Sequence, residues 1–215
     1  MCKIFSKSVE TGIFPLEWKH AKVLPPFKKD DKTDPNNYRP ISILPVIAKV
    51  FERIICNQLY KYLVQNKLLT KLQSGFPSLH STITAMLDAT NEWYVNFDQG
   101  KTNAVAFLDL TKAFDTVSHD ILISKLELLG ISGVTLNWFK SYLSERKQCC
   151  VVKESTSQAR YITCGVPQGS ILGPLLFLIY INDLPGCLSY STARMYADDT
   201  SITVFSKSTI AHARN

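Results

Sequence analysis

The sequence lacks any C-x-x-C pair, although it contains six cysteines, and it has no secretory leader. Paired cysteines at that spacing are typical of zinc sites, and disulfide frameworks are typical of secreted chains. Neither a zinc site nor a disulfide framework is therefore indicated. We expect an intracellular, reducing compartment. The cysteines are Cys2, Cys56, Cys149, Cys150, Cys164 and Cys187.

Long apolar runs are also missing. The longest, residues 175–181 after Gly173-Pro174, is far shorter than the roughly 20 residues that a membrane span needs. We predict a buried helix there and no membrane partner. The sequence has no internal repeat and no low-complexity tract, and its 46% hydrophobic and 20% charged residues are typical of one globular domain.

The excess of positive charge lies in the first third of the chain. Residues 1–70 contain 12 Lys+Arg and 6 Asp+Glu, whereas residues 71–215 contain 12 of each, which accounts for the net charge of +6. Lys and Arg bind phosphates, so this basic part fits a polyanionic partner. An ordinary solvated surface is the alternative, because an excess of six is modest.

Helical and extended patterns alternate along the chain. Residues 22–27 and 38–43 are expected to be extended segments joined by a charged loop. The spacing of apolar residues predicts several helices. We expect residues 148–152 and 160–164 to pair as a hairpin, and residues 193–205 to form a second hairpin. This mixture indicates the α+β class. The predicted helices cover residues 47–63, 81–97, 120–129, 135–144 and 175–184.

Two acidic segments carry the strongest chemical pattern. Asp198 and Asp199 follow Tyr196-Ala197 between β-prone flanks, and Asp109 ends the apolar run 105–108. Adjacent Asp residues are most often simple turn formers, but the flanks here place them at a hairpin tip. Successive side chains of an extended chain point to opposite faces, so only one of the pair can aim fully at a shared metal. We assign that place to Asp198 and a supporting or second-metal role to Asp199.

Carboxylates brought together from two strands would repel each other and resist ionising unless a cation neutralised them. Mg²⁺ prefers carboxylate and phosphate oxygens, so the pattern predicts Mg²⁺, with Mn²⁺ as the alternative ion.

Other residues could bind a nucleotide. Phe114 lies five residues after Asp109, where it could pack beneath a sugar and exclude a 2′-hydroxyl, although such a residue is more often part of a core. Gln168 lies in the glycine- and proline-containing turn 165–169, which lets the main chain approach a ligand. Lys28, Lys29 and Arg39 could bind phosphate, or form a solvated charged turn.

These residues occur in motifs with a recognisable order: Tyr-Arg-Pro-Ile-Ser at 38–42, Gln-Ser-Gly-Phe at 73–76, a segment at 107–115, another at 165–174, and Tyr-Ala-Asp-Asp at 196–199. Together they resemble the non-LTR (LINE-type, jockey-like) retrotransposon reverse transcriptases. The resemblance covers nearly the whole chain, and five ordered motifs are far more specific than one.

The resemblance implies a right-hand polymerase with an antiparallel palm sheet packed on helices. Residues 1–100 would form the fingers and first helices, and residues 101–215 mainly the palm. It implies an RNA-directed DNA polymerase that acts by two-metal nucleotidyl transfer on an RNA template, a DNA primer or target, and deoxynucleoside triphosphates. The parent element would act in the nucleus, which these residues do not themselves encode.

The resemblance also implies individual roles. Asp109, Asp198 and Asp199 would be catalytic carboxylates, with the Leu110 carbonyl as a further metal ligand. The nucleotide-binding residues would be Lys28, Lys29, Arg39, Phe114 and Gln168. The template and primer contacts would be Gly75, Phe76, Pro167, Gly169 and Tyr196.

The sequence departs from the family pattern in two ways. Pro77 stands where many relatives have Arg, and the chain ends at Asn215, before the expected thumb, with no endonuclease domain before Met1. We therefore expect part of a longer polyprotein or a decayed copy. A catalytically silent nucleic-acid-binding remnant is the competing hypothesis.

Overall fold

The computed structural model describes residues 2–75 and 81–207. The chain forms two compact units, and each is built from two separate stretches. Unit 1 comprises Met1–Leu68 and Lys112–Tyr180, and unit 2 comprises Leu69–Thr111 and Ile181–Asn215. The expected assignment of residues 1–100 and 101–215 to fingers and palm stays a prediction.

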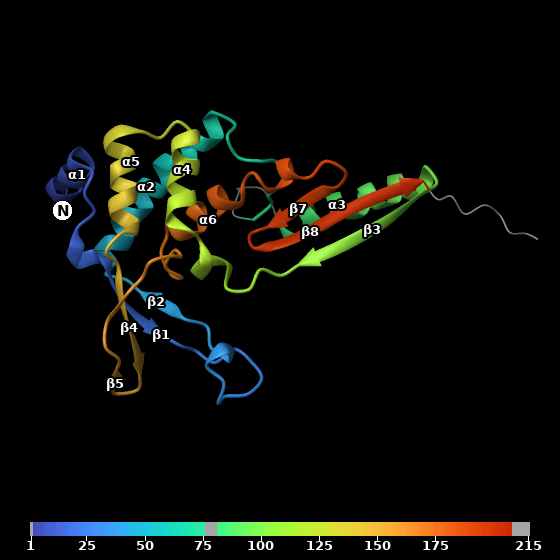
Figure 1. Ribbon diagram of the computed structural model, residues 1–215. Helices are drawn as coiled ribbons and strands as arrows, with labels where there is room; N and C mark the ends of the chain where they lie inside the picture. Colours follow the sequence, from blue (N-terminus) through green and yellow to red (C-terminus); the bar gives the residue numbers. More distant parts are fainter. Residues whose placement is uncertain (1, 76–80, 208–215) are drawn as a thin grey trace, which may run out of the picture. The chain divides into compact units, whose positions relative to one another are not determined.

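The helices of unit 1 enclose an aromatic core. Phe14, Phe51, Trp138 and Tyr142 are all buried. Some of their rings meet edge to face, as in the pair Phe14–Tyr142 with centroids 5.1 Å apart, and others stack, as in Trp138–Tyr142. Figure 1 shows these helices gathered together. They are α1 (Cys2–Thr11), α2 (Val46–Gln65), α4 (His119–Leu128), α5 (Gly133–Leu143) and α6 (Gly173–Ile181).

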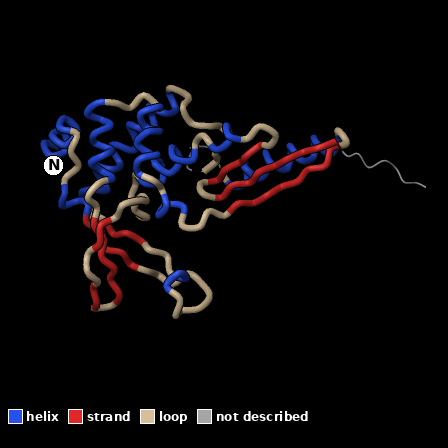
Figure 2. Tube along the Cα trace, in the orientation of Figure 1, coloured by secondary structure: helices blue, strands red, loops and turns tan. Residues whose placement is uncertain are grey.

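The sheet of unit 1 mixes parallel and antiparallel pairs. Its strands are β1 (His20–Leu24), β2 (Ile41–Ile43), β4 (Lys147–Val152), β5 (Ser155–Thr156) and β6 (Arg160–Tyr161). The order is β2-β1-β4-β5, with β6 also paired to β4. β1 is antiparallel to β2 and parallel to β4. Short 3-10 turns, drawn as helix in Figure 2, are η1 (Leu16–Lys19), η2 (Pro35–Asn37) and η3 (Ala113–Thr116).

Unit 2 is a three-stranded antiparallel sheet with one long helix, as Figure 1 shows. The helix is α3 (Thr82–Asp98), and the strands β3 (Lys101–Leu108), β7 (Thr192–Tyr196) and β8 (Asp199–Lys207) are ordered β3-β8-β7. A 3-10 turn, η4 (Leu184–Cys187), precedes β7.

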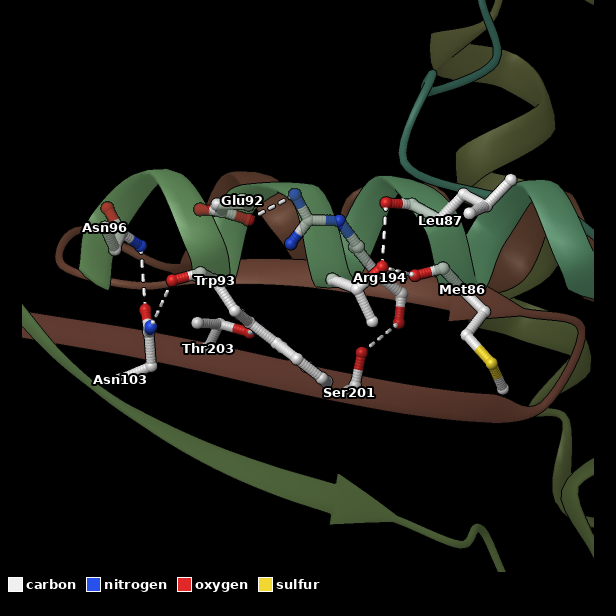
Figure 3. A network of polar contacts seen from close by, with 10 residues as sticks. Met86, Leu87, Glu92, Trp93, Asn96, Asn103, Arg194, Ser201 and Thr203 are labelled. Carbon is white, nitrogen blue, oxygen red and sulfur yellow. Dashed lines mark hydrogen bonds and ion pairs between the residues drawn. The ribbon is translucent and has the colours of Figure 1, made fainter. Parts of the chain in front are cut away.

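Polar side chains join α3 to all three strands (Figure 3). Asn96 Nδ2 donates to Asn103 Oδ1 of β3 at 2.7 Å, and Trp93 Nε1 donates to Thr203 Oγ1 of β8 at 3.2 Å. Glu92 forms an ion pair with Arg194 of β7. The helix is therefore fixed along the sheet by specific polar contacts.

The predicted α+β class and the five predicted helices are confirmed. Two details differ. The buried helix ends at Ile181 rather than at residue 184, because a turn at residues 182–183 separates it from η4. The hairpin β4–β6 pairs only Lys147↔Tyr161 and Gln148↔Arg160. Within the described part of the chain, no helix is long and apolar enough to span a membrane.

Candidate functional site

Two of the three predicted carboxylates lie where paired strands end and begin. β3 ends at Leu108, so Asp109 is the first residue after it, and β8 begins at Asp199. The last pair of the β3–β8 ladder joins Leu108 and Thr200. Because antiparallel pairing advances one residue on each strand, Asp109 and Asp199 come to the same end of the sheet.

The third carboxylate lies in the adjacent turn. Ala197 and Asp198 form the two-residue connection between β7 and β8, and Tyr196 pairs with Asp199 across it. The predicted hairpin tip is thus confirmed. Asp109 and Asp199 are exposed and Asp198 is partly exposed, so water and ions can reach all three residues.

The structure does not assemble these acids into a complete metal site. Across residues 2–75 and 81–207, no group of three or more His, Cys, Asp or Glu is arranged to hold a metal ion. The donors gathered at this end of the sheet are nevertheless carboxylate oxygens, to which the resemblance adds the Leu110 carbonyl. Such donors fit a hard divalent cation such as Mg²⁺ or Mn²⁺ and not a zinc site.

Gln73 supports the turn that carries Asp198, and no role was predicted for it. Its Oε1 accepts hydrogen bonds from Ala197 N at 2.9 Å and Gly75 N at 2.7 Å, and its Nε2 donates to Ala197 O at 3.2 Å. The motif at 73–76 contained this residue, but only Gly75 and Phe76 were assigned. Gln73 and Ala197 are 124 positions apart in the sequence, and a contact between such distant residues produces no local pattern from which it could be predicted.

The turn at 165–169 lies in unit 1 and is held by main-chain hydrogen bonds. Val166 N donates to Phe114 O at 2.8 Å, and Ser42 N donates to Gln168 O at 2.7 Å. Gly169 has φ +109°, and a Cβ there would lie 2.6 Å from Ser42 O, so a side chain would not fit. The turn therefore lies close to the main chain of η3 and β2, and its approach to a ligand stays a prediction.

The Gln168 side chain is also held. Its Nε2 donates to Asp115 Oδ2 at 3.0 Å. Burial raises the pKa of Asp115, although this hydrogen bond and the nearby Lys112 favour the ionised form. Asp115 was not predicted as a site residue, because its role depends on a contact with residue 168.

Gln168 and Asp115 line a pocket of about 490 Å³ in unit 1. Lys112, Arg146 and Tyr38 line it too, so the pocket offers cationic, amide and phenol groups to a ligand. Arg146 is 1% exposed, and its Nε and Nη2 are buried without a hydrogen-bond partner among the described residues. Such donors are suited to a polar ligand atom.

The remaining nucleotide-binding candidates occupy different surroundings. Lys28, Lys29 and Arg39 are exposed on the predicted β1–β2 hairpin, where Lys28 N donates to Asn37 O and Arg39 N donates to Pro26 O. Phe114 is partly buried, with its ring centroid 4.8 Å from that of Phe177. Phe114 therefore has a packing partner, and its contact with a sugar stays a prediction.

The predicted template and primer residues differ in accessibility. Gly75 and Pro167 are buried, Tyr196 is partly exposed and Gly169 is exposed. Phe76 lies outside the described residues, as does Pro77. Gly75 packs closely against the backbone of Ala197. Its contact with nucleic acid stays a prediction.

The chain resembles known proteins both in sequence and in structure. The family described as reverse transcriptase (RNA-dependent DNA polymerase) matches residues 27–215. Two proteins of Drosophila melanogaster are each 35% identical: the probable RNA-directed DNA polymerase from transposon BS, over 93% of this chain, and the RNA-directed DNA polymerase from mobile element jockey, over 97%. This chain spans 23% and 24% of their lengths.

Solved structures with this fold include two telomerases. The apo telomerase of Candida tropicalis, truncated from its C-terminal domain, aligns with a TM-score of 0.63 at 9% identity, over 92% of this chain and 45% of that one. The Candida albicans telomerase, in complex with a fragment of telomeric RNA, gives 0.58 at 12% identity, over 94% and 40%. This likeness confirms the expected fold, with helices and sheets of the fingers and palm kind. The chain belongs to the reverse transcriptase family, and its relatives are the RNA-directed DNA polymerases of non-LTR retrotransposons, as the ordered motifs predicted.

Proposed function

We propose that this chain is the polymerase portion of a non-LTR retrotransposon protein and that it copies an RNA template into DNA. The observation that supports this most directly is that Asp109, Asp198 and Asp199 lie at the same end of the β3-β8-β7 sheet. A DNA primer or target and deoxynucleoside triphosphates are the other proposed partners. The proposals that the partner is a target DNA and that the parent element acts in the nucleus rest only on the resemblance to the family.

In unit 2, Asp109 and Asp198 would hold Mg²⁺ together with the Leu110 carbonyl, and Asp199 would support them. When bound, Mg²⁺ would activate the primer 3′-oxygen and neutralise charge on the departing pyrophosphate. Elongation forms a bond from that oxygen to the α-phosphorus as the bond to pyrophosphate breaks. Accessible carboxylates are required at this place, which agrees with the exposure of Asp109 and Asp199.

In unit 1, the pocket lined by Lys112, Gln168 and Tyr38 would receive a nucleotide. Its cationic groups suit phosphate oxygens, and the Gln168 amide, fixed by Asp115, would orient the ligand. Exposed Lys28, Lys29 and Arg39 would add phosphate contacts. The alternative function is nucleic-acid binding without DNA synthesis, and no observation specifically favours it.

The test is primer extension by the full chain on an RNA template, titrated with Mg²⁺, beside Mn²⁺ binding followed by electron paramagnetic resonance. Asp198→Asn should lower extension by about 100-fold or more, because several kcal/mol of transition-state stabilisation depend on the metal. Asp88→Asn, an exposed carboxylate of α3, is the matched control and should leave both readouts unchanged. Undiminished extension by Asp198→Asn would refute the assigned role. Tight template binding without any extension by the unsubstituted chain would favour the silent remnant.

A further inference from the structure

The residue before Asp198 has an unusual backbone conformation. Ala197 has φ +56°, in the left-handed region, which costs an L-residue other than Gly about 1–2 kcal/mol. Such a conformation persists when the surrounding structure holds it. The contacts of Ala197 therefore show what determines the path of the chain into Asp198.

Gln73 holds both backbone groups of Ala197. Its Oε1 accepts from Ala197 N and its Nε2 donates to Ala197 O, at 2.9 and 3.2 Å. Gln73 is only 5% exposed. Its Oε1 also accepts from Gly75 N at 2.7 Å, so three hydrogen bonds fix the orientation of the amide. A buried amide bonded in this way has one arrangement, and so does the peptide that it binds.

The main chain around Gln73 extends the sheet beside β7. Met195 N donates to Leu72 O and Ser74 N donates to Met195 O, both at 2.8 Å, and Gln73 and Met195 form a parallel bridge. The amide of Gln73 is thus delivered from a segment that is itself hydrogen-bonded to the strand leading to the turn. Its position relative to the turn is set by the backbone.

Gly75 closes the contact from the same segment. A Cβ at Gly75 would lie 2.2 Å from Ala197 N and 2.9 Å from Ala197 Cα. No side chain fits this distance, and the neighbouring atoms are main chain, which cannot move aside as a flexible side chain can. The glycine is required by the close approach of two backbones.

We propose that Gln73 is a positioning residue that fixes the Ala197–Asp198 turn and thereby directs the Asp198 carboxylate, with Gly75 permitting the contact. This inference rests on the proposed role of Asp198 as a metal-binding residue. Gln73 touches neither metal nor substrate. It acts through the peptide that precedes Asp198, in the way that groups behind metal ligands orient the ligands.

The test compares Gln73→Met with the unsubstituted chain, because Met has a similar length and lacks the amide. The comparison is made at a temperature where circular dichroism shows that the variant is folded. The Mn²⁺ affinity and the kcat for primer extension should each fall by about 10- to 100-fold. KM for the deoxynucleotide should stay unchanged. The matched control is Asn103→Leu, which removes a hydrogen-bonded amide at the other end of β3 (Figure 3) and should lower stability without changing Mn²⁺ affinity or kcat.

Two further variants keep the inference falsifiable if Gln73→Met does not fold. Gln73→Glu retains an acceptor for Ala197 N and Gly75 N, but it buries a carboxylate whose second oxygen faces Ala197 O, so it should also lower kcat. Gly75→Ala must displace the turn and should reproduce the loss of metal affinity. Unchanged affinity and kcat in folded Gln73→Met, with Asp198→Asn inactive, would overturn the positioning role alone. Full activity of Asp198→Asn would overturn the proposed function itself.

Discussion

Glu52 is a carboxylate enclosed in the core of unit 1. Its Oε1 accepts from Tyr142 Oη at 3.0 Å, and its Oε2 accepts from Ile171 N at 2.7 Å. Burial nevertheless raises the pKa of Glu52, because these donors and the nearby Arg146 replace only part of the lost hydration. The folded state therefore binds a proton at Glu52 more readily than the unfolded chain does.

Glu52→Gln should consequently change the pH dependence of stability. The contribution of a raised pKa is complete below the ordinary value of 4.5 and is lost as pH rises through the raised value. The unfolding free energy of the variant, relative to that of the unsubstituted chain, should thus increase from pH 4 to pH 8 in urea titrations. Glu127→Gln, on the exposed face of α4, is the control. A difference that does not change with pH would contradict the prediction.

Phe114 offers a second test at the scale of one side chain. Phe114→Ala should lower the preference for deoxy- over ribonucleotides by about 10-fold or more, because it opens the space in which a 2′-hydroxyl would clash. Phe114→Tyr keeps the ring and should keep the preference. The measurement is single-nucleotide incorporation with each substrate. If the ratio of deoxy- to ribonucleotide incorporation were the same in both variants, Phe114 would have no role in sugar selection, and its ring would serve only to pack against Phe177.

Among the elements, α3 depends on its first turn. Ser81 is the N-cap: its Oγ accepts from Thr84 N at 3.2 Å, and Ser81 N donates back to Thr84 Oγ1 at 2.9 Å. This reciprocal arrangement satisfies two donors that a helix start otherwise leaves unpaired. The helix in turn carries the side chains that bind β3, β7 and β8.

Ser81→Ala should therefore lower the unfolding free energy by about 1 kcal/mol. Urea unfolding followed by circular dichroism would measure the loss. Asn91→Ala, at an exposed position within α3, should cost nothing, because Ala has the higher helix propensity. A similar loss in both variants would show that the cap is not what stabilises the helix start.

Local patterns predicted the elements well, and contacts between distant residues escaped them. The helix α2 and the β7–β8 hairpin follow from apolar spacing and turn residues, which depend on neighbours in the sequence. The parallel pairing of β1 with β4 joins strands more than a hundred residues apart, and no periodicity records it. The segment of α1 was not recognised as a helix.

The site divides in the same way. Asp109, Asp198 and Asp199 could be singled out because acidic residues after apolar strands are visible in the sequence. Gln73 and Asp115 could not, because their roles depend on Ala197 and Gln168, each of which lies far along the chain. The pairing of β3 with β8 is what connects the predicted acids.

At the scale of the whole molecule, the distribution of charge bears on how the chain would bind a polyanion. The excess of six positive charges lies within residues 1–70, and exposed Lys28, Lys29 and Arg39 share the β1–β2 hairpin with Asp30, Asp31 and Asp34. Lys29 Nζ lies 3.9 Å from Asp30 Oδ2 on the exposed surface. Mixed charges of this kind favour a small number of phosphate contacts over a strong general attraction.

The affinity for an RNA–DNA duplex should accordingly fall as the salt concentration rises. The slope of log affinity against log salt is proportional to the number of phosphate contacts. For duplex DNA, each phosphate neutralised contributes about 0.9 to the slope of log affinity against log salt. Arg39→Gln should lower the magnitude of the slope by about 1, whereas Lys140→Gln, an exposed lysine of α5, should leave it unchanged. Fluorescence anisotropy between 50 and 200 mM salt would supply both slopes. If the two variants lowered it equally, the excess charge would act as a diffuse field, and the hairpin would have no particular part in binding.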